Sequence, residues 1–365
     1  MLVTLSLVFL SALAAAALVA GGVRLYLRSR YLPTIVRIFE EAPFFAATLD
    51  EPAPDARDVS FRTADGLTLR GSYWPTTAPD RQGVILFCHE FTSHRWSCRP
   101  YCESLRTAGY DILTFDFRNH GQSDTLAGYE PLQWVSDHDV ADVKAALAYL
   151  ARRDDADPQG VGILGISKGG TAALVAAADS TGVAAVVTDG AFPTHEMLVV
   201  YMRRWVAIYS VARFSVDRVA MWIEETLARL GRPVSPWRRN NRFDRFARKA
   251  RRISGRRRNC RFVEVEEAVG RLGPCPWLMI HGGRDSYVLP EVAEGLFRYA
   301  GSGSKLWLVP LAKHNKSLQV AGDQYRKRVD DFFGHHLGTT RRRTSLRPLV
   351  PTDREPLAAP LSSGE

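Results

Sequence analysis

Six short apolar runs, separated by stretches of helical periodicity, constrain the fold of this chain more than any other feature. They lie at residues 83–88, 111–116, 161–165, 184–188, 276–281 and 305–310. Near-continuous apolar runs are typical of strands that are buried on both faces of a parallel sheet. The segment 137–152 between two of them carries Val140, Val143, Leu147 and Leu150 on one helical face. We therefore expect an α/β fold in which helices flank a mostly parallel sheet.

An antiparallel hairpin comes before this alternation. Two runs of alternating polarity within residues 59–74 are joined by Asp65 and Gly66, a pair typical of a two-residue turn. Together with the six apolar runs, they predict a sheet of eight strands. Ser136 and Asp139 have the spacing of a capping box at the start of the helix predicted over 137–152.

The N-terminal segment predicts a membrane anchor. Residues 2–23 contain no charged side chain, and a helix of this length spans about 33 Å, close to the ~30 Å hydrocarbon core of a bilayer. Arg24, Arg28 and Arg30 follow, and positive flanks stay on the cytoplasmic side. We therefore expect a single-pass membrane protein with its N-terminus outside and the rest of the chain in the cytoplasm. A cleaved signal peptide is the weaker alternative, because the arginines follow the apolar run instead of preceding it. The five cysteines lack paired zinc spacing, which agrees with a reducing compartment.

The remaining composition divides the chain into further segments. We expect an anchor with its basic flank over residues 1–31, a linker over 32–58, an α/β domain over 59–338 and a disordered tail over 339–365. About 87 residues separate the strand ending near Thr188 from the one beginning at Pro276. Connections in α/β units are normally 2–6 residues long. An inserted subdomain is therefore expected over about 191–274.

The insertion carries most of the positive charge of the chain. Residues 200–261 hold 18 Lys and Arg against four acids, a local charge of +14, so that the rest of the chain carries −5 of the total +9. This localised charge disfavours a general nucleic-acid binder and favours contact with an anionic membrane.

A nucleophile motif follows the strand predicted over 161–165. The chain reads Gly165-Ile166-Ser167-Lys168-Gly169 and continues into a helix of small residues. This strand–turn–helix context is the one that a G-x-S-x-G motif requires. The glycines remove side chains that would clash in the sharp turn that presents the serine hydroxyl. We predict Ser167 as the nucleophile, with an ordinary loop as the alternative.

This motif and two later ones resemble the α/β-hydrolase superfamily, in the branch that contains serine-aminopeptidase-like and monoacylglycerol-lipase-like hydrolases. The resemblance covers roughly residues 55–335 and implies that the insertion forms or flanks a lid over the active site. The apolar residues of this lid that are expected to help bind an acyl chain are Met197, Leu198, Val199, Tyr201, Trp205, Ile208 and Trp222. Members carry an acid in an H-G-x-x-D-x-x-V setting, which matches Asp285, and a histidine after the last strand, which matches His314. The resemblance implies that His314 takes the proton of Ser167 and that Asp285 orients the imidazole. Asp189, after the preceding strand, is the alternative acid.

The resemblance also implies an oxyanion site. The expected donors are the backbone amide of Lys168, next to the nucleophile, and that of Phe91, in the loop after the strand over 83–88. Similar hydrolases usually have glycine where this chain has Glu90. We expect Glu90 either to turn away or to modify the site. The run 116–124 resembles a structural loop of these families, so that His120 is expected to form a loop hydrogen bond.

These features predict a membrane-anchored serine hydrolase. It would cleave a carboxylic ester or thioester, with a lipid-like acyl substrate favoured, through an acyl-enzyme intermediate. The alternatives are a peptidase of the serine-aminopeptidase kind and a catalytically silent membrane scaffold whose basic insertion binds a partner. No cofactor or metal ion is expected, because no phosphate-binding glycine motif follows the first strand of the alternation and the histidines lack metal-ligand spacing.

Overall fold

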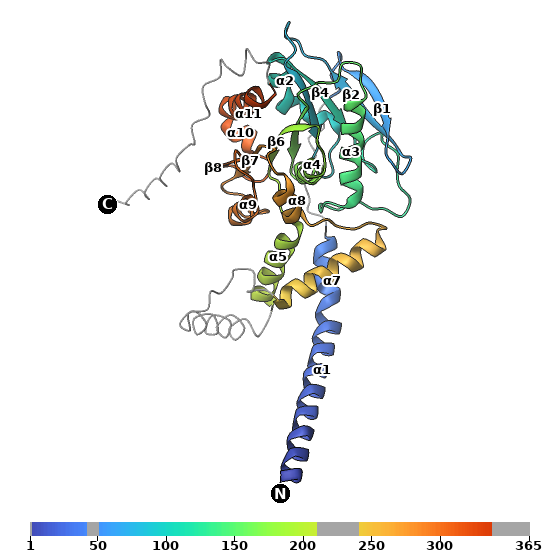
Figure 1. Ribbon diagram of the computed structural model, residues 1–365, viewed down its shortest axis with the longest axis vertical. Helices are drawn as coiled ribbons and strands as arrows, with labels where there is room; N and C mark the ends of the chain where they lie inside the picture. The colour runs from blue at the N-terminus through green and yellow to red at the C-terminus, as the bar shows by residue number, and fades with distance from the viewer. Residues whose placement is uncertain (1, 42–50, 210–240, 338–365) are drawn as a thin grey trace, which may run out of the picture.

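Figure 1 shows the computed structural model of the protein, which describes residues 2–41, 51–209 and 241–337. Its centre is an eight-stranded sheet. The strands are β1 (Arg57–Arg62), β2 (Thr68–Trp74), β3 (Gly83–Cys88), β4 (Tyr110–Phe115), β5 (Val161–Ile166), β6 (Val183–Asp189), β7 (Trp277–Gly282) and β8 (Lys305–Val309). Their order is β1-β2-β4-β3-β5-β6-β7-β8. β2 pairs antiparallel with β1 and β4, and the other neighbours are parallel, which confirms the predicted sheet.

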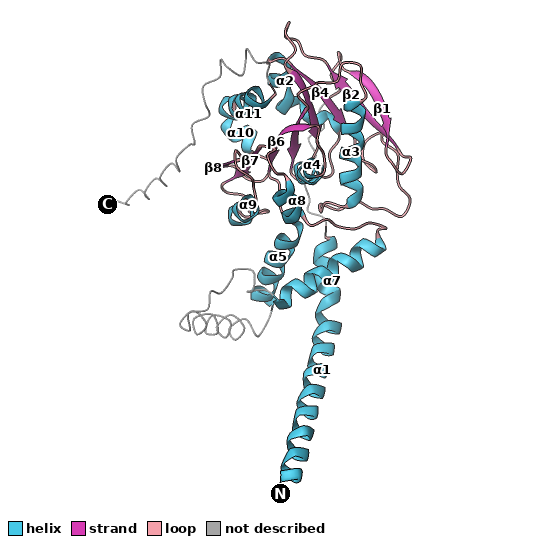
Figure 2. Cartoon of the chain, in the orientation of Figure 1, coloured by secondary structure: helices cyan, strands magenta, loops and turns pink. Residues whose placement is uncertain are grey.

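Helices cover both faces of this sheet (Figure 2). The helices on the sheet are α2 (Arg99–Thr107), α3 (Asp137–Ala151), α4 (Lys168–Ala178), α8 (Val265–Arg271), α9 (Pro290–Phe297), α10 (Ser317–Ala321) and α11 (Asp323–His336). Side chains alternate between the two faces along a strand. In β3, Leu86 belongs to an apolar cluster with residues of α3, α4 and α8, whereas Ile85 and Phe87 belong to another with residues of α2 and α11.

Two local predictions are settled by hydrogen bonds. Ser136 and Asp139 form the expected capping box at the start of α3. The β1–β2 hairpin is different from the prediction, because Thr63 N donates to Leu67 O and leaves three residues in the loop rather than two. Gly66, at φ 90°, takes the positive φ that a three-residue hairpin loop needs.

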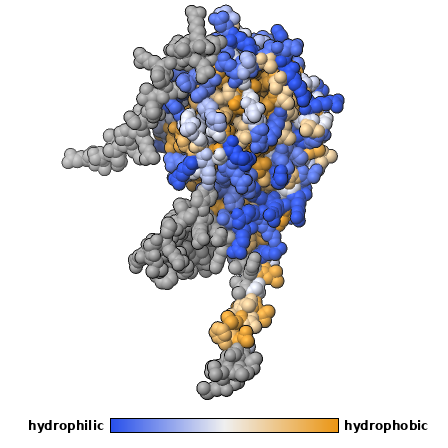
Figure 3. Space-filling model, viewed as in Figure 1, coloured by the Kyte–Doolittle hydropathy of each residue, from blue (hydrophilic) through white to orange (hydrophobic). Residues whose placement is uncertain are grey.

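The N-terminal helix α1 (Leu2–Glu40) is continuous over 39 residues and projects from the rest of the protein (Figure 1). Its projecting part presents apolar surface (Figure 3). The large apolar side chains exposed there are Phe9, Leu10, Leu13, Leu18, Val19, Leu25 and Tyr26. The membrane-spanning helix predicted over residues 2–23 is not confirmed, because no helix in the described ranges is both long enough and apolar enough to cross a bilayer.

The segment between β6 and β7 forms a group of helices at one end of the domain. It contains α5 (Thr194–Tyr209), α7 (Asn241–Arg257) and α8, and residues 210–240 lie outside the described ranges. We call α5, α7 and the last turns of α1 the helical cover. Its apolar contacts are made by Leu32, Ile35, Val36 and Phe39 of α1, Met197, Leu198, Val199 and Met202 of α5, and Ala247 and Ala250 of α7.

Some predictions fall outside the described part of the chain. The predicted tail over 339–365 lies there, as does Trp222. The side chains of Trp205 and Ile208 are likewise outside it. Of the residues predicted to bind an acyl chain, Met197, Leu198 and Val199 are buried in the helical cover and Tyr201 is partly buried against it.

Candidate active site

The turn between β5 and α4 carries Ser167. Its backbone has φ 49° and ψ −118°, a conformation that residues with side chains rarely adopt. Glycines allow the surrounding backbone to approach closely. A Cβ on Gly165 would lie 2.5 Å from the Cα of Gly170, and one on Gly169 would lie 2.3 Å from the carbonyl oxygen of His89. These glycines therefore let α4 begin directly against the ends of β3 and β5.

Loops at the carboxyl ends of β7 and β8 bring Asp285 and His314 to this turn. Ser167 Oγ lies 2.9 Å from His314 Nε2, and His314 Nδ1 lies 2.7 Å from Asp285 Oδ2. The three side chains thus form one continuous hydrogen-bonded chain that engages both ring nitrogens. Ser167 is only 4% exposed and Asp285 only 2%, so that the chain is shielded from water.

Asp285 is held in one orientation by its own loop. Its Oδ1 accepts hydrogen bonds of 2.8 Å from the amides of both Tyr287 and Val288. His281 Nε2 donates to Val288 O at 2.9 Å and lies 3.5 Å from Asp285 Oδ2. Burial lowers the pKa of His281, which favours its neutral form. Amide donors to a carboxylate are strong, so that Asp285 presents its second oxygen to His314 in a fixed direction.

Asp189, the alternative acid, occupies a different place. It ends β6, and its carbonyl oxygen accepts a 2.8 Å hydrogen bond from the amide of Ser167. Its carboxyl oxygen Oδ1 instead accepts from Ser317 Oγ at 2.8 Å. Burial raises the pKa of Asp189 to about 7. The carboxylate that is hydrogen-bonded to the imidazole of His314 is therefore that of Asp285.

The two predicted oxyanion donors come from neighbouring residues. Lys168 begins α4, and its ammonium lies 5.5 Å from the centre of the Phe91 ring. Neither backbone N–H meets an acceptor within the residues that the structure describes. The amides of Lys168 and Phe91 therefore have the chemistry required to bind a developing oxyanion.

Glu90, the departure from the family pattern, is directed at a neighbouring hydroxyl. Its Oε2 accepts a hydrogen bond of 3.2 Å from Ser97 Oγ, in the 3₁₀ turn Arg95–Cys98. Burial raises the pKa of the Glu90 carboxyl. Of the two behaviours expected for Glu90, the described contact matches the one in which the side chain turns to another partner.

A buried ion pair at the start of α4 was missed by the sequence reasoning. Lys168 Nζ lies 2.9 Å from Asp139 Oδ1, and both side chains are almost fully buried. Asp139 was predicted only as a capping residue, and it fills both roles. A lysine inside the nucleophile motif was the available signal, because a buried ammonium needs an anionic partner. The pair holds the residue whose amide is one of the two predicted donors.

Tyr287 is a second residue that the sequence reasoning missed. Its ring centre lies 5.0 Å from that of His314. Tyr201 of α5 donates from its hydroxyl to the carbonyl oxygen of Tyr287 at 3.1 Å. The helical cover is therefore in direct contact with the loop that carries Asp285. The position of Tyr287, two residues after the acid, was the only signal in the sequence.

The other histidines near the site have structural partners. His89 Nε2 accepts from Phe117 N at 3.2 Å, and His120 Nδ1 lies 2.9 Å from Arg118 O. Burial lowers the pKa of both rings. His120 thus forms the loop hydrogen bond that the sequence predicts. Across the described ranges, no group of three or more His, Cys, Asp or Glu side chains could hold a metal ion.

Comparisons with known proteins agree with this architecture. A family model described as the alpha/beta hydrolase fold matches residues 83–318. The solved structure of the esterase Pf2001 of Pyrococcus furiosus aligns with a TM-score of 0.57 at 20% identity, over 82% of this chain and 99% of that chain. The match to the family model includes Ser167, Asp285 and His314.

Curated relatives match shorter stretches. An uncharacterized protein of Mycobacterium tuberculosis is 28% identical over 165 residues, which are 45% of this chain and 55% of the relative. The thiohydrolase aneE of Aspergillus aculeatus is 30% identical over 132 residues, which are 36% of this chain and 40% of that protein. The chain thus spans about half the length of the first relative. Because the family model covers more than half of the chain, this protein belongs to the α/β-hydrolase fold family.

Proposed function

We propose that the protein is a serine hydrolase that cleaves carboxylic esters or thioesters through an acyl-enzyme intermediate. The observation that carries this proposal is the hydrogen-bonded chain from Ser167 Oγ through His314 to Asp285, with distances of 2.9 and 2.7 Å, at a strained strand–helix turn. A serine hydroxyl becomes a nucleophile when a neighbouring imidazole can accept its proton.

Each residue of the site has a distinct role in the proposed reaction. Ser167 Oγ attacks the carbonyl carbon while His314 Nε2 takes its proton, and Asp285 stabilises the imidazolium that forms. The amides of Lys168 and Phe91 bind the oxyanion of the tetrahedral intermediate. His314 then protonates the leaving alcohol or thiol. Water, activated by the same imidazole, hydrolyses the acyl-enzyme and restores Ser167.

The named relatives support the class of bond. One solved structure with the same fold is called an esterase, and one partial relative is called a thiohydrolase. The apolar side chains of the helical cover support an acyl substrate, since Met197 and Leu198 belong to the same apolar cluster as Val288, within three residues of Asp285. We therefore propose a lipid-like acyl ester or thioester as the substrate.

We further propose that the protein works at a membrane surface, with its catalytic domain on the cytoplasmic side. Supporting this, α1 exposes large apolar side chains such as Phe9 and Leu18, which are 66% and 77% exposed. Exposed apolar surface of this extent is typical of contact with lipid or another protein. Arg28 and Arg30, also exposed, follow this apolar part of α1. Cell fractionation and protease accessibility of the intact chain test this location.

The hydrolase proposal is tested by a fluorophosphonate probe and a substrate panel. We expect the wild type to be labelled and Ser167→Ala to remain unlabelled, with a loss of ester hydrolysis on the order of 10⁴- to 10⁶-fold. The panel contains matched acyl esters, acyl thioesters and aminoacyl amides. Turnover of aminoacyl amides alone would identify a peptidase instead. An absence of serine-dependent labelling, with the variant correctly folded, would leave a catalytically silent scaffold.

A further inference from the structure

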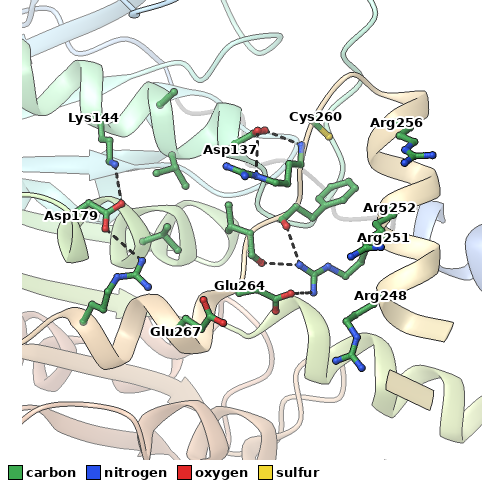
Figure 4. Close-up of a pocket in the computed structure, with 17 residues that line it drawn as sticks. Asp137, Lys144, Asp179, Arg248, Arg251, Arg252, Arg256, Cys260, Glu264 and Glu267 are labelled. Atoms are coloured by element: carbon green, nitrogen blue, oxygen red, sulfur yellow. Dashed lines mark hydrogen bonds and ion pairs between the residues drawn. The ribbon is translucent and has the colours of Figure 1, made fainter. Parts of the chain in front are cut away.

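A cavity of about 730 Å³ lies between α3, the end of α4, α7 and α8 (Figure 4). Ser167, His314 and Asp285 do not line it. Seven basic and four acidic side chains line it, together with apolar ones that include Val140, Val175 and Phe262. The cavity therefore combines an excess of positive charge with an apolar wall. Nothing in the proposed reaction uses this place.

Four of the seven basic side chains are paired. The pairs are Arg251–Glu264 (2.7 Å), Lys144–Asp179 (2.9 Å), Arg271–Asp179 (3.5 Å) and Arg261–Asp137 (3.9 Å). Arg248, Arg252 and Arg256 have no ion-pair partner among the residues that the structure describes, and one further carboxylate, Glu267, lines the cavity with them. We call these three side chains the arginine row.

The spacing of the arginine row puts its charges on one face of α7. Residues four apart in a helix are neighbours on its surface, and like charges at this spacing destabilise a helix. Arg248 and Arg252, and Arg252 and Arg256, are such pairs, and all three side chains are exposed. The folded protein thus holds three mutually repelling cations at one cavity. A bound polyvalent anion would remove this repulsion and gain charge-assisted hydrogen bonds.

The end of α7 and the residues that follow it also make ionic and aromatic contacts with α1. Arg258 and Arg257 lie 2.9 and 3.4 Å from the carboxylate of Glu40, at the end of α1. Phe262, which lines the cavity, packs edge-on against Phe39 of α1 with ring centres 4.9 Å apart. The arginine row therefore lies on the helix that is joined to the apolar, projecting α1 (Figure 1). Apolar surface in the hydrocarbon and arginines at the phosphate level is the arrangement that fits an anionic bilayer.

We propose that the arginine row and its cavity bind the phosphate headgroups of anionic membrane lipids. This inference rests on the proposed membrane location and names the lipid that the cover recognises. Guanidinium groups suit this role because they donate several hydrogen bonds to phosphate oxygens in a planar geometry. The apolar wall of Val140, Val175 and Phe262 receives the part of the lipid next to the headgroup. A soluble phosphate would have no use for this wall or for α1.

The test measures binding of the full chain to vesicles of phosphatidylcholine and to vesicles that also contain phosphatidylglycerol. The variant is the triple substitution Arg248→Gln, Arg252→Gln and Arg256→Gln. The control removes the same charge from exposed arginines at the β1–β2 end of the sheet, by Arg57→Gln, Arg62→Gln and Arg70→Gln. Each cation near an anionic leaflet contributes about fivefold to binding. We expect the row variant to lose on the order of 100-fold on anionic vesicles at low salt, and the control variant to lose far less.

Binding to neutral vesicles and thermal unfolding show whether the row variant is folded. Equal losses in the row and control variants would overturn the site, because net charge alone would then explain the binding. Soluble glycerol 3-phosphate is also tested for a saturable rise in the thermal unfolding temperature of the wild type. If the row variant lost this shift but bound vesicles as the wild type does, the lipid site would be overturned and a soluble ligand identified. If the wild type binds neither kind of vesicle, the membrane location fails with this inference. Fluorophosphonate labelling of Ser167 in the wild type tests the hydrolase separately from all of these outcomes.

Discussion

The carboxyl edge of the sheet and the helical cover are held by different forces. At the sheet edge, polar side chains are fixed by short hydrogen bonds, as Asp285 is by two amides of its own loop. In the cover, α1, α5 and α7 meet mainly through apolar side chains. One buried polar contact stands out there, from Trp134 Nε1 to the carbonyl oxygen of Phe39 at 2.7 Å. Directional bonds suit chemistry that needs fixed geometry, whereas apolar packing tolerates rearrangement.

From this difference we infer that the carboxyl edge of the sheet carries out the chemistry and that the helical cover controls access to it. Ser167 and Asp285 are almost fully buried, so that access to them depends on the elements that pack around the site. The cover touches the catalytic loop through Tyr201 and Tyr287. Elements that move during a catalytic cycle are drawn from the less stable parts of a protein. We therefore expect changes at the sheet edge to affect turnover and changes in the cover to affect local stability and membrane binding.

The largest expected effect distinguishes two carboxyls at the sheet edge. Asp285→Asn removes the anion that orients and stabilises the imidazole of His314, and we expect kcat to fall on the order of 10⁴-fold. Asp189→Asn keeps an acceptor for Ser317 and replaces a carboxyl whose pKa burial raises to about 7. We expect it to change kcat less than about tenfold. Equal losses from the two substitutions, measured by steady-state ester hydrolysis, would contradict the assignment of the acid.

Substitution of two buried tryptophans allows the stability of the helical cover to be compared with that of the sheet. Trp134→Phe removes the indole donor to Phe39 in the cover, and Trp277→Phe removes the donor to Thr188 Oγ1 at 2.9 Å in the sheet. Leaving a buried acceptor without its donor costs about 1–3 kcal/mol. In hydrogen exchange, we expect Trp134→Phe to speed exchange in α1 and α7 while β5 stays protected. Trp277→Phe should instead lower the global free energy of unfolding. Similar exchange patterns in the two variants would argue that cover and sheet open as one unit.

The smallest expected effect is on stability at low pH. Asp65 lies 2.7 Å from the guanidinium of Arg118, which lowers the pKa of Asp65 to about 2. A carboxyl whose pKa is lower in the folded state stabilises the fold above its unfolded pKa of about 4, and this contribution is lost as the pH falls toward 2. We therefore expect Asp65→Asn to lose less stability than the wild type between about pH 4 and pH 2, measured by urea unfolding. The exposed Asp80→Asn is the control and should follow the wild type.

Much of the sheet and of the candidate site could be predicted because the signals are local. Six strands follow from short apolar runs and two from the alternating pattern of residues 59–74, whereas Asp285 and His314 were assigned through the resemblance to known hydrolases. The three-residue hairpin loop, the Lys168–Asp139 pair and the contact between Tyr287 and His314 were not predicted. Each of these depends on the relative positions of two segments, which are either far apart in the chain or on the two sides of a turn.

The cover was less predictable for the same physical reason. The pattern of residues 2–23 predicted a membrane-spanning helix, and the structure does not confirm it. The sequence also did not indicate that the last turns of α1 pack against Trp134 and Phe262. Apolar side chains at helical spacing identify a buried face without identifying its partner. Asp139 shows both situations in one side chain. Its capping role could be predicted because it is local, whereas its ion pair with Lys168 could not.

The proposed reaction requires that Ser167 forms a covalent acyl intermediate. The most direct measurement exposes the full chain briefly to an activated acyl ester, quenches it in acid and locates the added mass by peptide mapping. We expect one acyl group on Ser167 in the wild type and none at that position in Ser167→Ala. An acyl group on another residue, or turnover of the ester by Ser167→Ala at the wild-type rate, would contradict it.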